Sequence, residues 1–230
     1  MTERENILGR IREALAVPAP PPGDAQAGPH ATAPATVPSP AALRQWLPQV
    51  GVGFEERLEL FRTQAAALKA EFHFLNTEEE VAKLLAELRA TESWNSIASH
   101  RGKLTDLACR AVGLPVCYVD EGYDVAELEK CDAGITECDA LVAQTGSVLV
   151  TSRSAGGRGL SVLPPHHVVL ARREQLVGDL SDAFVVLKQK YSASYPSFIS
   201  FITGPSRTGD IERILVLGAH GPKKLTILCH

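Results

Sequence analysis

Apolar and polar positions follow two different rhythms along the central part of the chain. In some stretches apolar residues recur at helical spacing, whereas others are short apolar runs of the kind that form buried strands. The stretches with helical spacing are residues 54–72, 77–92 and 104–112, and the short runs are residues 73–75, 96–98 and 116–119. Because strand and helix alternate in short units, the sequence predicts the α/β class, with a mainly parallel sheet flanked by helices.

A different pattern begins after Asp132. The apolar runs 141–143 and 147–151 enclose a glycine-containing turn at residues 144–146, which predicts a β-hairpin. The remaining predicted elements are strands at residues 167–171 and 198–202, a helix at residues 180–191, and a strand at residues 225–228 that closes the sheet. The second half therefore supplies further strands to the α/β core.

Capping residues mark two of the helix boundaries. Thr77 and Glu80 form a capping box at the start of the second helix. Gly113 follows the third helix, at a position where a residue that tolerates a left-handed conformation ends helices. These local signals agree with the boundaries that the apolar pattern predicts.

The first 53 residues differ from the rest in composition. Residues 1–16 are predicted to form an amphipathic helix with an apolar stripe. Residues 17–53 are predicted to be a Pro/Ala-rich linker, because such a segment buries too little apolar surface to offset its ordering entropy. The alternative is an ordered strap over the body of the protein. Residues 54–230 then form the α/β domain, onto which the helix at residues 54–72 packs.

Composition narrows the classes of function. The 230 residues are 45% hydrophobic and 22% charged, and the net charge of −4 gives no electrostatic reason for binding nucleic acid or an acidic membrane. No apolar run approaches the length of a membrane span, and the N-terminus lacks the order of a signal peptide, so we expect a cytoplasmic protein without membrane insertion. The five cysteines lack the spacing of a zinc or iron–sulfur site, so we expect reduced thiols and no cofactor in this chain.

The candidate chemistry gathers around residues 203–212. An apolar run enters this stretch and helical spacing follows it, which predicts the order strand, tight turn, short helix. Free N–H groups, hydroxyls and a guanidinium at a helix start suit a carboxylate or phosphate. The residues predicted to bind such an anion here are Thr203, Gly204, Ser206, Arg207, Thr208 and Asp210. The alternative is a capped turn in which Arg207 only pairs with Asp210.

Two other glycine-containing turns follow apolar runs, at residues 144–146 and 153–159. Ligands of open α/β sheets bind at the carboxyl ends of strands, so we expect the three turns to meet there. The further residues predicted to bind the anion are Thr145, Gly146 and Arg158. Arg158 and Arg207 would bracket the anion, and the alternative for Arg158 is a solvated side chain at the tip of a mobile hairpin.

Three histidines have candidate roles. His166 and His167 are adjacent on a predicted strand, so their side chains point to opposite faces and cannot easily share a metal ion. We expect them to be structural residues hydrogen-bonded to backbone. His220 lies in a turn and is the candidate for proton transfer or anion binding, because imidazole titrates near neutrality. A structural role for His220 is the alternative.

Several blocks in the second half carry a family resemblance. They are residues 134–136 with 145–147, residues 158–167, residues 203–212 and residues 220–222. Over roughly residues 77–230 the chain resembles the lactate-utilisation protein C family, whose LUD domain is similar in fold to CoA transferases and sugar-phosphate isomerases. The resemblance implies an α/β sandwich and a cytosolic role in oxidising L-lactate to pyruvate. It also implies two companion proteins, at least one of which carries iron–sulfur clusters.

The chain departs from the family pattern at a few positions. Gln144 stands where an acidic residue often precedes Thr-Gly, Glu137-Cys138 replaces a pair of small residues, and Gly209 replaces Ala or Ser. A CoA transferase needs a glutamate nucleophile, and Gln144 cannot form the acyl anhydride. Glu137 lies before the predicted hairpin, so CoA transfer is not expected.

Three hypotheses about function follow. The leading one is a subunit of an L-lactate-oxidising system that binds a small carboxylate or phosphate, with redox cofactors in companion proteins. The second is a non-catalytic assembly or metabolite-sensing module, in which the N-terminal helix docks a companion. The third is a sugar-phosphate isomerase-like enzyme, which rests on fold analogy alone. The sequence leaves open whether this chain is itself an enzyme.

Overall fold

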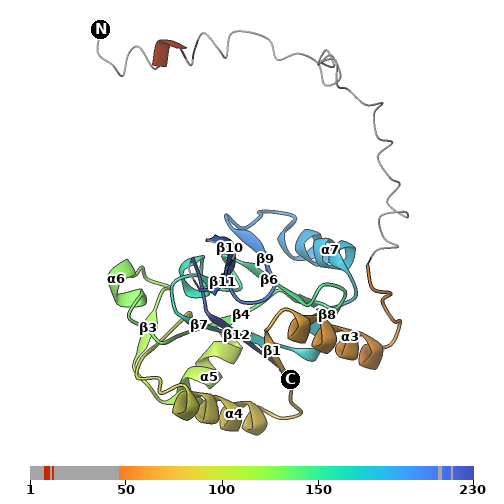
Figure 1. Cartoon of the computed structure of the whole chain (residues 1–230), viewed down its shortest axis with the longest axis horizontal. Coiled ribbons are helices and arrows are strands. Elements are labelled where there is room, and N and C mark those ends of the chain that lie inside the picture. Colours follow the sequence, from red (N-terminus) through yellow and green to blue (C-terminus); the bar gives the residue numbers. More distant parts are fainter. Residues whose placement is uncertain (1–7, 11, 13–46, 212–213, 219) are drawn as a thin grey trace. The chain divides into compact units, whose positions relative to one another are not determined.

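Six parallel strands form the main sheet in the computed structural model of the chain, in the order β1, β12, β7, β4, β2, β3 (Figure 1). The strands are β1 (Glu71–Phe74), β12 (Lys224–Cys229), β7 (His166–Ala171), β4 (Ala133–Glu137), β2 (Ile97–Ser99) and β3 (Val116–Tyr118). The predicted α/β class and the mainly parallel sheet are confirmed. The strand predicted to close the sheet lies inside it instead, because β12 pairs with both β1 and β7.

The structure describes residues 8–10, 12, 47–211, 214–218 and 220–230. The predicted N-terminal helix and most of the predicted linker lie outside the described residues, apart from residues 8–10 and 12, which are helical. Leu47–His230 forms one compact unit. In the described part of the chain, no helix combines the length and the apolar character needed to cross a bilayer.

Helices α4 (Glu78–Thr91) and α5 (Lys103–Val112) cover one face of the main sheet (Figure 1). The residues buried between these helices and the sheet include Leu85, Ile97, Leu104, Ile135 and Leu170. Thr77 Oγ1 accepts the N–H of Glu80 at 3.2 Å at the start of α4. Gly113, with a φ of 64°, ends α5. The two boundaries predicted from capping residues are therefore confirmed.

A second sheet, which the sequence pattern did not separate from the first, lies on the other face. It contains β8 (Leu176–Val177), β5 (Ala140–Val142), β6 (Ser147–Thr151) and β9 (Ile199–Ile202), in that order. β5 and β6 form the predicted hairpin. One face of this sheet packs with α3 (Phe54–Ala67) against the main sheet, and α7 (Leu180–Tyr191) covers the other. The result is a layered α/β sandwich.

Helix α3 is shorter than the stretch with helical spacing. Lys69 has a φ of 66°, a conformation that helices do not continue through, and β1 starts at Glu71. Phe72 of β1 packs edge-on against Phe61 of α3, with ring centroids 4.8 Å apart. The apolar stripe that extended the prediction therefore belongs to two elements that pack on each other.

The remaining described elements are short. They are α6 (Val125–Leu128), the 3₁₀ turns η1 (Gly159–Ser161) and η2 (Arg173–Gln175), and the strands β10 (Arg207–Ile211) and β11 (Ile214–Leu217). β10 and β11 pair antiparallel as a separate two-stranded sheet (Figure 1).

Candidate functional site

The stretch predicted to begin a helix forms a β-hairpin instead. Arg207, Thr208 and Asp210 lie on strand β10, which pairs antiparallel with β11. The prediction of a helix at this point was wrong, because a short apolar run satisfies helical and strand spacing equally well. Gly209 disfavours helix, and the β-branched residues around it favour strand. No helix N-terminus therefore faces a ligand here.

Two of the three predicted turns do meet. The hydroxyls of Ser147 and Thr203 lie 2.8 Å apart, which ties the turn containing Thr145 and Gly146 to the turn containing Gly204. Both turns press on α3. A Cβ added at Gly146 would lie 2.7 Å from the backbone nitrogen of Ala65, and one added at Gly204 would lie 2.7 Å from the carbonyl oxygen of Leu68. Both glycines also have positive φ, so no other residue fits well.

The turn that carries His220 lies against Ser206, two residues after Gly204. The Ser206 N–H donates to the Pro222 carbonyl at 2.9 Å, and the Gly218 N–H donates to the Ser206 carbonyl at 2.9 Å. His220 itself is exposed, as is Arg207, one residue after Ser206. The structure therefore brings Ser206, which precedes β10, close to the turn that carries His220, which follows β11.

A cleft of about 580 Å³ opens beside this turn, and we call it the His220–Lys223 cleft. Its lining residues are Glu129, Val162, Leu163, Pro165, Gly218, His220, Gly221 and Lys223. The Lys223 N–H donates to the Pro165 carbonyl at 2.8 Å, which joins the two segments that lead into β12 and β7. Lys223 and His220 give the cleft its basic groups, and Val162 and Leu163 give it an apolar wall.

The cleft lies at the opposite end of the sheet from the one predicted. Pro165 directly precedes β7 and Lys223 directly precedes β12, so the cleft is at the amino ends of these parallel strands. The expectation of a crevice at the carboxyl ends concerned the turns at residues 144–146, 153–159 and 203–210 and stays a prediction for them, whereas the His220 turn lies at the amino ends. The rule for open sheets assumes that a helix leaves each strand at its carboxyl end, whereas a hairpin and a tight turn lead into β12 here.

Arg158 lies apart from Arg207. Its guanidinium carbon is 5.2 Å from the centre of the Phe198 ring, just before β9 begins. The Arg207 guanidinium lies beyond the other end of β9, where its Nη2 is 3.5 Å from the position of a Cβ added at Gly204, and a strand of four residues spans about 13 Å. The prediction that Arg158 and Arg207 bracket one anion was therefore wrong. Long-range pairing of β9 with β6, which the local sequence does not encode, sets this separation.

Lys223 and Glu129 are two cleft residues that the sequence pattern did not single out. Lys223 follows a Gly-Pro turn and precedes a strand, which is a signal that can be recognised from sequence. Glu129 directly follows the short helix α6, far from every motif. Its approach to the cleft depends only on tertiary packing.

The carboxyl ends of the strands hold polar residues that bind backbone groups. Glu137 Oε1 accepts the N–H groups of Leu104 at 2.9 Å and Thr105 at 3.4 Å, so it caps α5. His100 Nε2 lies 3.3 Å from the Glu137 N–H and accepts it, and both carboxylate oxygens of Asp120 accept the Arg101 N–H. Glu137 therefore acts in the structure as a helix cap.

The adjacent histidines occupy opposite faces of β7, as predicted. His166 Nε2 lies 2.8 Å from Thr226 Oγ1, and His167 Nε2 lies 2.9 Å from Thr136 Oγ1, so their partners are threonine side chains instead of the expected backbone. Burial lowers the pKa of His166. Burial, and then the neighbouring His166, lower the pKa of His167 to about 3. Both imidazoles are neutral at physiological pH, which fits a structural role.

A buried ionic group joins the second sheet to α7. The Asp139 side chain is fully buried, and its Oδ1 accepts from the Lys190 ammonium and from the Tyr191 hydroxyl, the latter at 2.7 Å. The Tyr191 hydroxyl also lies 3.3 Å from Thr151 Oγ1. Because every partner lies on β6 or α7 or leads into β5, this network fixes α7 on the sheet.

Four of the five cysteines are buried in surroundings that favour the neutral thiol. Burial raises the pKa of the Cys131 thiol to about 11 and that of Cys229 to about 12, and it raises the pKa of Cys109 and Cys138 as well. Thiolates are the nucleophilic and metal-binding form, so these thiols are unreactive near neutral pH. Within the described ranges, no group of three His, Cys, Asp or Glu side chains is arranged to hold a metal ion.

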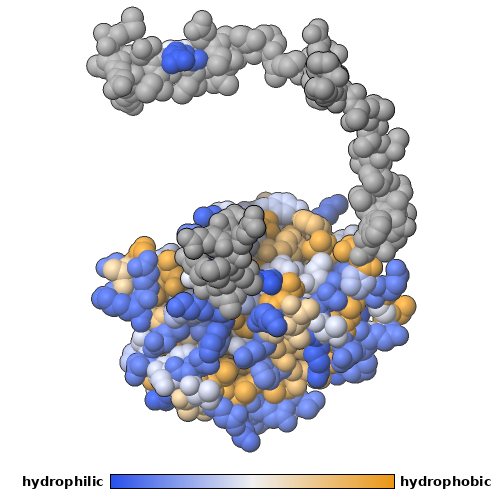
Figure 2. Space-filling view, in the orientation of Figure 1, coloured by the Kyte–Doolittle hydropathy of each residue, from blue (hydrophilic) through white to orange (hydrophobic). Residues whose placement is uncertain are grey.

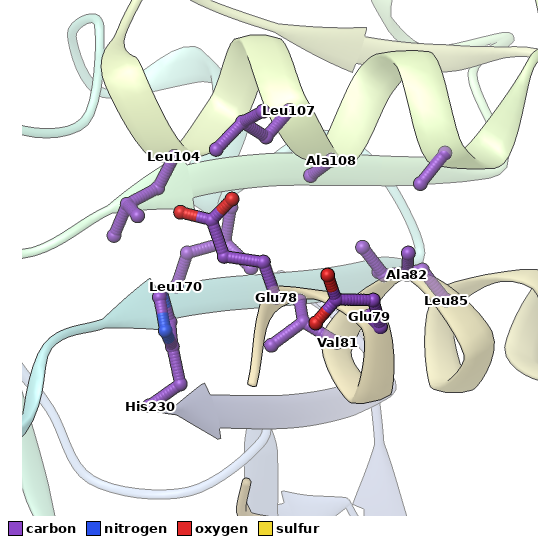
Figure 3. Close-up of a pocket in the computed structure, with 11 residues that line it drawn as sticks. Glu78, Glu79, Val81, Ala82, Leu85, Leu104, Leu107, Ala108, Leu170 and His230 are labelled. Carbon is purple, nitrogen blue, oxygen red and sulfur yellow. The ribbon is translucent and has the colours of Figure 1, made fainter. Parts of the chain in front are cut away.

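A second hollow, of about 230 Å³, lies between α4 and α5 (Figure 3). Figure 3 shows Leu104 and Leu107 of α5 on one side and Val81 of α4 on the other, with the Glu78 side chain between the two helices. A groove that is lined by two carboxylates and by no lysine or arginine does not suit an anion, whereas the cleft sets Lys223 and His220 beside the single carboxylate of Glu129. The groove contains none of the residues predicted to bind an anion.

Comparisons with known proteins identify the family. A sequence profile of the LUD domain matches residues 58–229. The chain is 38% identical over 100 residues to lactate utilization protein C of Halalkalibacterium halodurans (43% of this chain, 44% of that protein) and 35% identical over 105 residues to that of Anoxybacillus flavithermus (46% of each). A third relative, lactate utilization protein C of Deinococcus radiodurans, is 29% identical over 126 residues, 50% of this chain and 58% of that protein.

The chain spans about half the length of the curated relatives it matches. Among solved structures, a DUF162 family protein from Deinococcus radiodurans superposes with a TM-score of 0.61 at 19% identity, covering 78% of this chain and 99% of that one. At this identity the likeness concerns the fold. Because the sequence profile covers most of the α/β unit, the chain belongs to the LUD domain family.

Proposed function

We propose that this chain is a subunit of a cytoplasmic system that oxidises L-lactate to pyruvate, and that it binds a small carboxylate or phosphate in the His220–Lys223 cleft. The names of the curated relatives, lactate utilization protein C, support the role in lactate utilisation. The observation that carries the ligand site is the cleft itself, where Lys223 and His220 line a hollow of about 580 Å³.

The chemistry of the lining suits a short 2-hydroxy acid. The Lys223 ammonium would pair with the carboxylate, and an apolar wall of Val162 and Leu163 would receive the methyl group. The His220 imidazole would accept the proton of the hydroxyl as its carbon is oxidised. Arg207 on the adjoining hairpin would add a second positive charge.

Oxidation of lactate to pyruvate removes two electrons and two protons. In the proposed system the hydroxyl proton passes to His220. The broken C–H bond gives its proton and two electrons to the companion proteins, whose iron–sulfur clusters, implied by the family resemblance, accept the electrons. The part assigned to this chain is binding of the acid and transfer of the hydroxyl proton. Ser206 contacts the turn that lines the cleft, where its N–H donates to the Pro222 carbonyl, and its hydroxyl is the proposed hydrogen-bonding group.

Calorimetric titration tests the ligand site. Lactate, pyruvate and inorganic phosphate would each be titrated into the full chain and into Lys223→Gln, which removes the charge and keeps much of the side-chain length. We expect the variant to bind about tenfold more weakly, a loss of about 1.4 kcal/mol. Lys83→Gln is the matched control, because Lys83 is an exposed lysine that pairs with Glu87 on α4, away from the cleft.

Equal affinity of Lys223→Gln and the unaltered chain would remove the cleft from the proposal. Binding of phosphate without binding of lactate or pyruvate would instead favour a phosphate-bearing ligand and a sugar-phosphate isomerase-like activity. Binding of lactate without turnover in the presence of the companion proteins would favour the metabolite-sensing role.

A further inference from the structure

Strand β9 forms one edge of the second sheet and has an unpaired outer side. β9 pairs antiparallel with β6, with Val150 opposite Ser200, and the Ser152 N–H donates to the Phe198 carbonyl at 2.9 Å. Backbone groups of an antiparallel strand point alternately toward and away from the neighbour. The N–H and C=O groups of Ile199 and Phe201 therefore point outward. Among the described residues, no other strand pairs with this side.

The other edges of the two larger sheets carry features that prevent edge-to-edge pairing. β1 carries the charged Glu71 and a histidine, β3 has three residues, and β8 has two. Short edges and charged side chains are the usual protection against unwanted strand pairing. β9 has four residues, Ile-Ser-Phe-Ile, without a charge. Of the four edges of the two larger sheets in the described part of the chain, it is the one that lacks both forms of protection; β11 (Ile-Leu-Val-Leu) is also uncharged, but it belongs to the separate two-stranded hairpin.

An exposed apolar surface lies next to this edge. On α7, the exposed fractions are 37% for Leu180, 58% for Phe184 and 51% for Val185, and Ile199 of β9 is 39% exposed. The Phe184 and Phe201 rings contact each other, with centroids 5.7 Å apart, so the helix and strand parts of this surface are continuous. Figure 2 shows hydrophobic residues gathered over α7 on the face in view. Exposed apolar patches of this kind mark interaction surfaces.

We propose that β9 pairs with β9 of a second copy of this chain, antiparallel about a two-fold axis at Ser200, and joins the two four-stranded sheets into one. In this register Ile199 of one copy faces Phe201 of the other. All the outward N–H and C=O groups of these two residues then find partners. An antiparallel strand pair is self-complementary, as a two-fold interface requires.

The absence of charged residues on β9 favours a second copy of this chain as the partner that pairs with this edge. In a two-fold interface each residue near the axis meets its own counterpart, so a charged strand would place like charges opposite each other. β9 carries no charge, and the flanking Ser197, Phe198 and Thr203 carry none. The pairing also brings Phe201 and Ile199 of the two copies together beside Phe184. The exposed apolar surface is thereby covered.

Light scattering coupled to size-exclusion chromatography tests the dimer. The full chain is expected to have twice the monomer mass, falling toward the monomer on dilution. Phe184→Glu places a charge on the apolar surface, and Ile199→Pro removes an outward N–H without removing a bond to β6. Each is expected to raise the dimer dissociation constant at least tenfold, with an unchanged far-UV circular dichroism spectrum.

Val125→Glu is the matched control, because Val125 is 52% exposed but lies on α6. It is expected to leave the dissociation constant unchanged. A full chain that stays monomeric at all concentrations, or that pairs only with a different protein, would overturn the proposal. A dimer that both β9-side variants leave intact would overturn it as well.

Ser200→Cys tests the register. Across a non-hydrogen-bonded pair the two Cα atoms lie about 4.5 Å apart, which suits a disulfide. Under mild oxidation this variant is expected to form a disulfide-linked dimer, and the unaltered chain, whose cysteines are buried or half-buried, is not. Ser197→Cys is the control, because in this register the two copies of position 197 lie about 20 Å apart. Cross-linking of Ser197→Cys but not of Ser200→Cys would overturn the register.

Discussion

Polar residues have different roles at the two ends of the main sheet. At the carboxyl ends, Glu137 caps α5, Asp120 accepts a backbone N–H, and His100 bridges two backbone groups. At the amino ends, His220 and Lys223 are exposed around a cleft. The carboxyl-end residues hold the chain in place, whereas the amino-end residues are accessible to a ligand.

This difference shows why polar residues at strand ends do not by themselves identify a site. A helix that follows a parallel strand presents free N–H groups at that end of the sheet, and nearby carboxylates satisfy them. A hairpin and a tight turn lead into β12 instead, so no helix start among the described residues presents free N–H groups at this amino end. The side chains of His220 and Lys223 are therefore accessible to a ligand. Four experiments test this contrast.

The largest effect is expected from acid acting on the buried histidine near the amino ends. The unfolded chain binds a proton at His167 below about pH 6.5, whereas the folded chain does so only near its lowered pKa of about 3. The unfolded state therefore holds more protons in this window, and the free energy of unfolding falls as the pH falls. We expect a loss of about 2–3 kcal/mol from this residue between pH 6 and pH 4.

Urea unfolding at a series of pH values measures this loss. His167→Gln removes the titrating group and keeps a polar side chain opposite Thr136. The variant is expected to be less stable at neutral pH but to lose less stability on acidification. The same slope in both proteins would contradict the assignment of this histidine as buried and neutral.

The next effect is expected at the carboxyl ends. Glu137→Ala leaves the N–H groups of Leu104 and Thr105 without their acceptor, and we expect a loss of stability of about 1–3 kcal/mol in urea unfolding. Glu137→Gln, which keeps an acceptor, should lose less. Anion binding should be unchanged in both variants. A defect in binding with unchanged stability would place the ligand at the carboxyl ends instead.

A smaller effect is expected at the hairpin beside the cleft. Arg207→Lys keeps the charge but loses the planar pair of donors, so we expect anion affinity to fall about tenfold or less, with little change in stability. Calorimetric titration with lactate and phosphate measures the change. Unaltered affinity would exclude Arg207 from the ligand's contacts.

The smallest effect is expected from Arg158→Lys. Its guanidinium lies over Phe198, at the far end of β9 from Thr203, so anion affinity should change less than twofold. The same titration measures it alongside Arg207→Lys. A loss equal to that of Arg207→Lys would mean that both arginines reach one ligand after all.

The hairpin of β10 and β11 shows where local pattern fails as a guide to the site. Residues 207–217 contain apolar positions at both helical and strand spacing, and the choice between them depended on pairing between two strands. The convergence of Thr145 and Gly146 with Thr203 and Gly204 was predicted from the rule that ligand-binding turns gather at strand ends. The structure adds that both glycines are closely packed against α3. Glu129 gave no signal, because nothing near it in sequence points toward the cleft.

The sequence alone determined the α/β class, the hairpin of β5 and β6, and the boundaries at Thr77 and Gly113. These features depend on periodicity, turn residues and capping, all of which act within a few residues. Only the tertiary structure decided that β12 lies between β1 and β7, that Arg158 and Arg207 are apart, and that the cleft lies at the amino ends. Strand order and register are set by contacts between residues far apart in the chain, which no local pattern encodes.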